Sequence, residues 1–251
     1  MRCRGLNWEN GEPMKEKCTA IILAAGQGKR MGSQVAKQYM LLNGYPVLYY
    51  SLKAFQESFV DAIVLVTSAK EIDYCREEIV DRYGFDKVTA VIAGGRERYH
   101  SVYNGLLAAS AETGYIFIHD SARPCLSEDI LERALQTVKK YHSAVVSMPV
   151  KDTIKFADEN GFVTSTPKRS SLYLMQTPQV FDFLPIKNAY ERLLALEKEG
   201  FPPDLEVTDD AMVMEKFGEF PVRLCEGSYR NIKLTTPEDL RILEEYLREG
   251  V

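Results

Sequence analysis

The sequence predicts an α/β protein with a Rossmann-like, doubly wound, mainly parallel sheet covered by helices, and with a projecting β-hairpin arm. Short apolar runs rich in β-branched residues alternate with segments of helical period through most of the chain. The runs are almost continuously apolar, which is typical of strands buried on both faces. Such alternation implies right-handed crossovers between parallel strands. After the last run, a strong turn signal interrupts the alternation and predicts the arm.

Five apolar runs are expected to form the strands of the sheet. They cover residues 19–25, 61–68, 88–95, 115–120 and 143–150. Helices are expected between them. One face of segment 71–83 carries the apolar side chains of Ile72, Cys75, Ile79 and Tyr83. Ser127 is the expected N-cap of the helix before the last run.

The chain after residue 150 departs from this pattern. Segment 151–173 is expected to form the arm, because Asn160-Gly161 is a strong signal for a two-residue hairpin turn. Helical periodicity returns at 185–200 and again between Thr208, an expected N-cap, and Gly218.

The C-terminal part is expected to hold a short strand at 231–236 and a last helix. Thr236 is the expected N-cap of that helix, with Pro237 at its first position and Asp239 at the capping-box position. We expect residues 1–18 to be a poorly ordered N-terminal extension, since they are polar and contain Pro and Gly. Residues 19–251 are expected to form a single domain.

Composition limits the class of protein. A chain of 251 residues that is 45% hydrophobic can bury one substantial core. No apolar run approaches the ~20 residues of a membrane span, and the start lacks the apolar region of a secretory signal. The five cysteines are scattered without a CxxC pair, so a reducing, cytoplasmic location is expected. The net charge of −5 argues against non-specific binding of nucleic acid.

A glycine-rich, basic loop, LAAGQGKRMG, follows the first strand. It lacks the GxxxxGK[ST] spacing of a P-loop, and Met31 replaces the third glycine of the dinucleotide fingerprint. The backbone of Ala24, Ala25 and Gly26 can approach a base and a triphosphate, and Lys29, Arg30 and Lys37 can surround the phosphates. A glycine-rich turn with solvated basic side chains is the alternative. The carboxyl end of a first strand is where open α/β sheets bind ligands, which favours a nucleotide site.

The loop and AKQY resemble the signature of sugar and polyol phosphate nucleotidyltransferases. Five further motifs resemble those of the 2-C-methyl-D-erythritol 4-phosphate cytidylyltransferases, and the resemblance extends from Thr19 to Leu247. These motifs are GGRERYHSVYNGL, HDSARP, QTPQVF, VTDDA and NIKLTTPEDL. The resemblance implies transfer of CMP from CTP to 2-C-methyl-D-erythritol 4-phosphate, giving 4-diphosphocytidyl-2-C-methyl-D-erythritol and pyrophosphate in non-mevalonate isoprenoid synthesis. No general base is needed, because a phosphate monoester is largely dianionic at pH 7.

The resemblance also implies roles for individual residues. Arg30 and Lys37 match the pair that grips the triphosphate, while Arg169 and Lys233 match the residues that position the attacking phosphate. Asp120 matches the carboxylate that holds Mg²⁺ or another divalent cation, although it could instead cap the next loop. The expected nucleotide contacts are Ala24, Ala25, Gly26, Gly28, Gly95 and Ser101. The expected contacts to the second substrate are Thr153, Thr177, Thr208, Asp209 and Arg123.

Several alternatives stay open at this point. Ser101 also fits an ordinary N-cap, and Arg98 and Arg123 fit either contacts to the base or structural ion pairs. His119 is expected to be structural. We expect a homodimer through the arm, in which Arg169 and Thr153 serve the partner's site, and no nucleic-acid or membrane partner.

Three other functions compete with this reading. A ribitol 5-phosphate cytidylyltransferase is the nearest, although HDSARP has Ala122 where those enzymes tend to carry valine. A nicotinamide-dependent oxidoreductase and a non-catalytic nucleotide-binding or regulatory module are more distant. The missing third glycine counts against the oxidoreductase, and the set of charged motif residues counts against the module.

Overall fold

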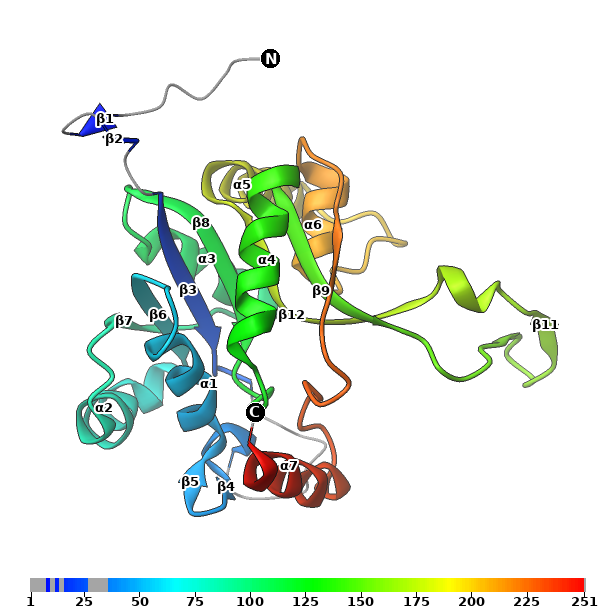
Figure 1. Cartoon of the computed structure of the whole chain (residues 1–251). Coiled ribbons are helices and arrows are strands. Elements are labelled where there is room, and N and C mark those ends of the chain that lie inside the picture. Colours follow the sequence, from blue (N-terminus) through cyan, green and yellow to red (C-terminus); the bar gives the residue numbers. More distant parts are fainter. Residues whose placement is uncertain (1–7, 10–11, 14–15, 27–35, 251) are drawn as a thin grey trace.

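A computed structural model of the chain describes residues 8–9, 12–13, 16–26 and 36–250. Helices cover both faces of a central seven-stranded sheet, and an arm projects from one side (Figure 1). The predicted fold class is confirmed. Arg30 and Gly28 lie outside the described residues. Among the described residues, no helix has both the length and the apolar character needed to cross a membrane.

The sheet has the strand order β13-β9-β12-β8-β3-β6-β7, and all five predicted apolar runs form strands in it. Only β12 runs antiparallel to its neighbours; the other paired neighbours are parallel. The bounds are β3 (Lys17–Leu23), β6 (Ala62–Thr67), β7 (Val88–Ala93), β8 (Thr113–Asp120), β9 (Ser143–Pro149), β12 (Tyr173–Asp182) and β13 (Leu224–Glu226). The chain builds β6 and β7 on one side of β3 and then places β8 on the other. This reversal is a topological switch point, where open α/β sheets bind ligands.

Two hydrophobic cores lie on the two faces of the sheet, because neighbouring strand residues such as Ile21 and Ile22 point to opposite faces. The first core contains side chains of α1 (Val47–Gln56), α4 (Glu128–Tyr141) and the helical segment made of α2 (Ile72–Tyr74) and the π-helical Cys75–Asp81. The second contains those of α3 (Arg98–Ala108), α5 (Phe183–Glu199) and α6 (Asp210–Phe217). A smaller core joins α7 (Pro237–Glu249) to Leu42, Ala122 and Leu234.

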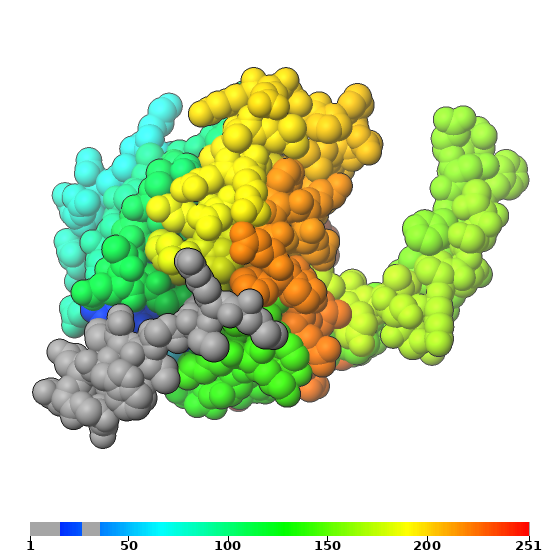
Figure 2. Space-filling model, turned by 90° about the horizontal axis from the view of Figure 1, so that it is seen from above, coloured from blue at the N-terminus to red at the C-terminus, as the bar shows by residue number. Residues whose placement is uncertain are grey.

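The arm leaves the sheet between β9 and β12 (Figure 1) and stands away from the body of the molecule (Figure 2). It carries a small antiparallel pair, β10 (Phe156–Ala157) with β11 (Val163–Ser165). The turn has three residues, 159–161, rather than the predicted two. The amide of Gly161 donates to the carbonyl of Asp158 at 3.0 Å, and Gly161 has φ +85°, a left-handed conformation that suits glycine.

Other local expectations meet mixed outcomes. Thr236 caps α7 in a capping box with Asp239, as predicted. Asp209 rather than Thr208 caps α6, because its carboxylate accepts from the amide of Met212 at 2.9 Å. The N-cap of α3 is Glu97, so Ser101 lies inside the helix and not at its cap.

The boundaries of two predicted segments also differ. Residues 231–236 form no strand, and the amide of Leu234 donates instead to the carbonyl of Ala122 at 2.8 Å. At the other end of the chain, β3 begins at Lys17, two residues inside the predicted extension.

Candidate active site

The loop after β3 is anchored at the switch point. The amide of Ala24 donates to the carbonyl of Val66 at 2.7 Å, and the carbonyl of Ala24 accepts from Nε2 of Gln38 at 2.7 Å. Gln38 lies at the centre of η2 (Lys37–Tyr39) and is only 2% exposed. It therefore ties the AKQY motif to the loop. Sequence reasoning did not single out Gln38, although a polar residue inside that motif was the available signal.

A second glycine segment borders this loop. A Cβ on Gly94 would lie 2.7 Å from both the Cβ of Ala25 and the Oγ of Ser101, so a glycine is required there. The amide of Gly95 donates to the Oγ of Ser101 at 3.0 Å. The structure thus brings the predicted nucleotide contacts Ala25, Gly95 and Ser101 together beside Ala24 and Gly26.

Asp120 ends β8 and is the centre of a cluster of charges. Its Oδ2 accepts from Nζ of Lys233 at 2.6 Å, and its Oδ1 lies 3.3 Å from both Nε and one terminal nitrogen of Arg98. Burial alone would raise the pKa of Asp120. The positive charges of Arg98, Lys233 and Arg123 outweigh it and hold that pKa well below its usual range. Asp120 is therefore an ionised anchor for cations.

Arg98 lies between two carboxylates, Asp120 and the fully buried Asp210. Its two terminal nitrogens donate to the two oxygens of Asp210 at 2.8 and 2.7 Å. Of the two alternatives left open for Arg98, this placement favours the ion pair over a contact to the base. Asp210 itself was not singled out by sequence reasoning.

Thr177 and His119 form a buried chain of hydrogen bonds that begins at the backbone amide of Asp120. The Oγ of Thr177 accepts from the amide of Asp120 at 3.1 Å and lies 3.1 Å from Nδ1 of His119. Nε2 of His119 donates to the carbonyl of Arg123 at 3.2 Å, which assigns the ring proton to Nε2. Burial lowers the pKa of His119 to about 4, so the ring is neutral at physiological pH. These contacts support the structural role expected for His119.

Two more predicted cations lie close to the segment that carries Lys233. Nζ of Lys37 donates to the carbonyl of Leu234 at 3.3 Å. Arg123 donates to the carbonyls of Asn231 at 2.8 Å and Met175 at 3.2 Å, and burial lowers the pKa of its guanidinium. Lys37, Arg123 and Lys233 thus converge on one segment. Fixed positive charge of this kind suits a polyphosphate ligand.

Within the described part of the chain, four further predicted residues make no hydrogen bond with Asp120, namely Arg169, Thr153, Thr208 and Asp209. Arg169 and Thr153 are exposed on the arm, where Arg169 donates to the carbonyl of Lys151 at 3.2 Å. Thr208 is exposed. Asp209 accepts from Nε2 of Gln179 at 2.9 Å in addition to capping α6.

The described residues contain no group of three His, Cys, Asp or Glu side chains that could hold a metal ion. Asp120 offers a single carboxylate whose two oxygens contact Lys233 and Arg98. A divalent cation at Asp120 would therefore need most of its ligands from substrate phosphates and water, an arrangement common for Mg²⁺.

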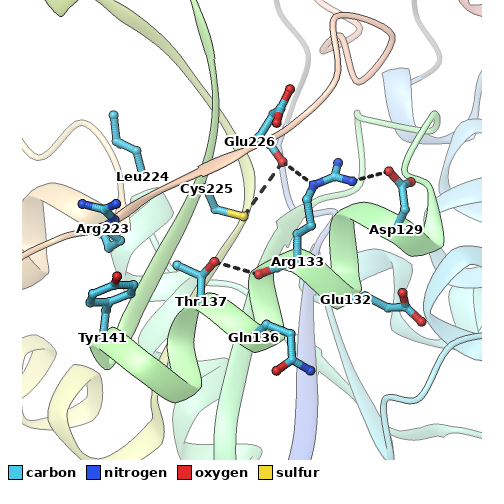
Figure 3. Close-up of a pocket in the computed structure, with 10 residues that line it drawn as sticks. All are labelled: Asp129, Glu132, Arg133, Gln136, Thr137, Tyr141, Arg223, Leu224, Cys225 and Glu226. Carbon is cyan, nitrogen blue, oxygen red and sulfur yellow. Dashed lines mark hydrogen bonds and ion pairs between the residues drawn. The ribbon is translucent and has the colours of Figure 1, made fainter.

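Two cavities of about 520 and 490 Å³ lie on either side of the edge strand β13 and are not lined by the Asp120 cluster. Figure 3 shows the larger one, where Arg133 of α4 contacts Asp129 and the carbonyl of Glu226. The guanidinium of Arg223 lies 4.9 Å from the ring centre of Tyr141. Neither cavity contains the motif residues Lys37, Asp120 or Lys233, so the chemistry is assigned to the switch point instead.

Comparison with known proteins gives one consistent family. The family model of 2-C-methyl-D-erythritol 4-phosphate cytidylyltransferase (IspD) matches residues 18–249. Among curated proteins, the chain is similar to the enzyme of that name from Lachnospira eligens, with 50% identity over 92% of this chain and 99% of that one. The enzyme from Lachnoclostridium phytofermentans is 46% identical over 93% of this chain and 97% of its own.

Among solved structures, the chain is similar to 4-diphosphocytidyl-2C-methyl-D-erythritol synthase from Anaerococcus prevotii. The TM-score is 0.79 at 30% identity, covering 93% of this chain and 96% of that one. The family match spans both the glycine loop and the Asp120 cluster. The chain therefore belongs to the 2-C-methyl-D-erythritol 4-phosphate cytidylyltransferase family.

Proposed function

We propose that this chain transfers CMP from CTP to 2-C-methyl-D-erythritol 4-phosphate, giving 4-diphosphocytidyl-2-C-methyl-D-erythritol and pyrophosphate in the non-mevalonate synthesis of isoprenoids. Family membership supports the reaction. The observation that carries the site is the contact of 2.6 Å between Lys233 and Asp120 at the carboxyl end of β8. It holds a cation at the sheet edge where the anionic substrates would meet.

The chemistry requires charge stabilisation more than proton transfer. An oxygen of the acceptor phosphate attacks the α-phosphorus of CTP, and the bond from that phosphorus to the bridging oxygen of pyrophosphate breaks. The acceptor is already largely dianionic, so no side chain has to remove a proton. The neutral, enclosed ring of His119 agrees with this reaction.

The roles of the remaining residues follow from where the charges lie. Lys37, together with Arg30, would hold the triphosphate and stabilise charge that develops on the leaving group. Lys233 would hold the acceptor phosphate against the α-phosphorus. The backbone around Ala25 and Gly95, with the hydroxyl of Ser101, would contact cytosine.

A divalent cation, Mg²⁺ in the first instance, is part of this proposal. Asp120 is the residue that would hold it, with phosphate oxygens and water completing its shell. When bound, the ion neutralises phosphate charge.

A homodimer through the arm is also proposed. The arm exposes four large apolar side chains to solvent, namely Ile154, Phe156, Phe162 and Val163. An isolated two-stranded hairpin is marginal in water, so burial of these side chains against a second copy would stabilise the arm. Arg169 and Thr153 would then reach the partner's active site.

We also propose a cytoplasmic location. Three buried cysteines of the described part, Cys75, Cys125 and Cys225, are free thiols, which agrees with a reducing compartment. Fractionation of the native cell and detection of the chain would test this.

The test of the reaction is pyrophosphate release from CTP, ATP, GTP and UTP with 2-C-methyl-D-erythritol 4-phosphate as acceptor. The expected result is release from CTP that depends on the acceptor and is lost with EDTA. Release from no nucleotide would favour a non-catalytic module. Quenching of protein fluorescence by NADH at micromolar concentration would favour the oxidoreductase.

A further inference from the structure

Asp210 is a fully buried carboxylate at the start of α6, behind the Asp120 cluster. Both of its oxygens accept from the terminal nitrogens of Arg98, at 2.8 and 2.7 Å, and the hydroxyl of Tyr190 on α5 bonds to one of them. The other side of the same guanidinium faces Oδ1 of Asp120 at 3.3 Å. Arg98 thus bridges a buried carboxylate and the carboxylate of the site.

The unequal distances show which partner sets the position of Arg98. A bidentate pair between arginine and carboxylate fixes the plane of the guanidinium, and it is strongest where water is excluded. The two contacts to Asp120 are longer by about half an ångström, so they follow from a position that Asp210 determines. With Oδ1 turned toward Arg98, Oδ2 of Asp120 faces Lys233.

We propose that Asp210 is a positioning residue for the transfer reaction: through Arg98 it orients Asp120, and Asp120 in turn holds Lys233 where the acceptor phosphate binds. This inference deepens the proposed function and rests on it. Asp210 itself touches no substrate. If the bridge served only to join α3 to α6, its loss would lower stability and leave the rate of the folded enzyme unchanged.

The test uses Asp210→Asn, which keeps the shape of the side chain and removes its charge, together with Arg98→Lys and the double variant. Asp182→Asn is the matched control, since Asp182 is also buried, bonds to His142 at 2.8 Å and pairs with Tyr115, far along β8 from Asp120. Specificity constants for the acceptor are measured at saturating CTP, below the unfolding temperature of each variant.

Each single change at the bridge is expected to lower the specificity constant by at least about tenfold. The specificity constant of the double variant should be no more than about threefold below that of the less active single variant, because both changes break the same chain of contacts. The control should lose less than about twofold, even if its melting temperature falls. A folded Asp210→Asn enzyme with the parental specificity constant would overturn the inference. A double variant whose loss equals the product of the two single losses would also overturn it.

Two further variants complete the test. If Asp210→Asn does not fold, Tyr190→Phe removes only the hydroxyl that bonds to Asp210, and parental rates in both Tyr190→Phe and Arg98→Lys would refute the role. Asp120→Asn tests the proposed site separately from the role of Asp210. A parental rate in Asp120→Asn would remove the proposed site itself, whereas an impaired Asp120→Asn beside a normal Asp210→Asn would remove only the role of Asp210.

Discussion

Charge on single residues decides what this site can do. Asp120 stays ionised in a buried place only because cations surround it, and those cations are the groups that a polyphosphate needs. The carboxylate therefore acts as a holder of positive charge and not as a base. Residues that supply this charge should affect the chemical step far more than the stability of the fold.

Lys37→Ala, and likewise Arg30→Ala, should slow turnover by about 10² to 10³-fold, because one preorganised contact to the triphosphate is lost. Steady-state rates with CTP and the acceptor measure this, with circular dichroism to verify the fold. Lys139→Ala on the exposed side of α4 is the control and should leave turnover unchanged. Near-normal turnover in a folded Lys37→Ala enzyme would remove Lys37 from the site.

His119 should make stability depend on pH. Its pKa is about 4 in the folded protein and about 6.5 when unfolded, so the unfolded state binds more protons between these values. Stability is therefore lost as pH falls from about 6.5 toward 4, by about 2 kcal/mol at pH 5. Urea unfolding at pH 7.5 and 5 measures it. A His119→Gln variant with an unchanged pH dependence would show that another group is responsible.

Sequence alone located most of the charged residues but not their partners. Lys233 and Asp120 were expected from motifs far apart in the chain, and the fold brings them into contact at 2.6 Å. Asp210 and Gln38 were missed because their roles depend on burial beside residues distant in sequence. A motif shows which residue types are present, but it does not show which of them are buried together.

The strands of the sheet also differ in how well the sequence predicts them. The parallel strands were predictable because both of their faces are buried, which makes the sequence continuously apolar. The antiparallel β12 was not predicted as a strand. Gln176, Thr177 and Gln179 interrupt its apolar pattern, and each of them is buried through hydrogen bonds to neighbouring segments. The expected strand at 231–236 is absent because the backbone of this segment bonds to a loop, with the amide of Leu234 donating to the carbonyl of Ala122.

The packing of α3 on β3 can be tested at one glycine. A Cβ on Gly105 would lie 2.7 Å from Cγ2 of Ile21, a buried, β-branched side chain that has no room to move. Gly105→Val should therefore lower the free energy of unfolding by about 2 kcal/mol or more. Ala108→Val, on the exposed face of the same helix, should cost less than about 1 kcal/mol. Equal costs in denaturant titrations would contradict this packing.

At the scale of the whole molecule, the arm is the part that a single chain leaves unsupported (Figure 2). Phe162 is 72% exposed near its tip, and Leu184 at the start of α5 is 64% exposed. Phe162→Ser should shift a dimer toward monomer in light scattering at micromolar concentration and lower activity in parallel. Leu184→Ser should do neither. A fully active parental monomer would contradict the proposed dimer.

The identity of the acceptor is the central claim, and the residues that bind CTP do not decide it. Methylerythritol phosphate carries a branching methyl group, and a pocket that buries it gains about 0.8 kcal/mol per carbon. Ribitol phosphate instead adds a hydroxymethine that a site for the shorter chain would have to accommodate. The most direct measurement is a side-by-side comparison of specificity constants for the two acceptors with CTP. We predict a preference for 2-C-methyl-D-erythritol 4-phosphate of at least about tenfold, or roughly 1.4 kcal/mol. Equal or faster turnover of ribitol 5-phosphate would contradict it.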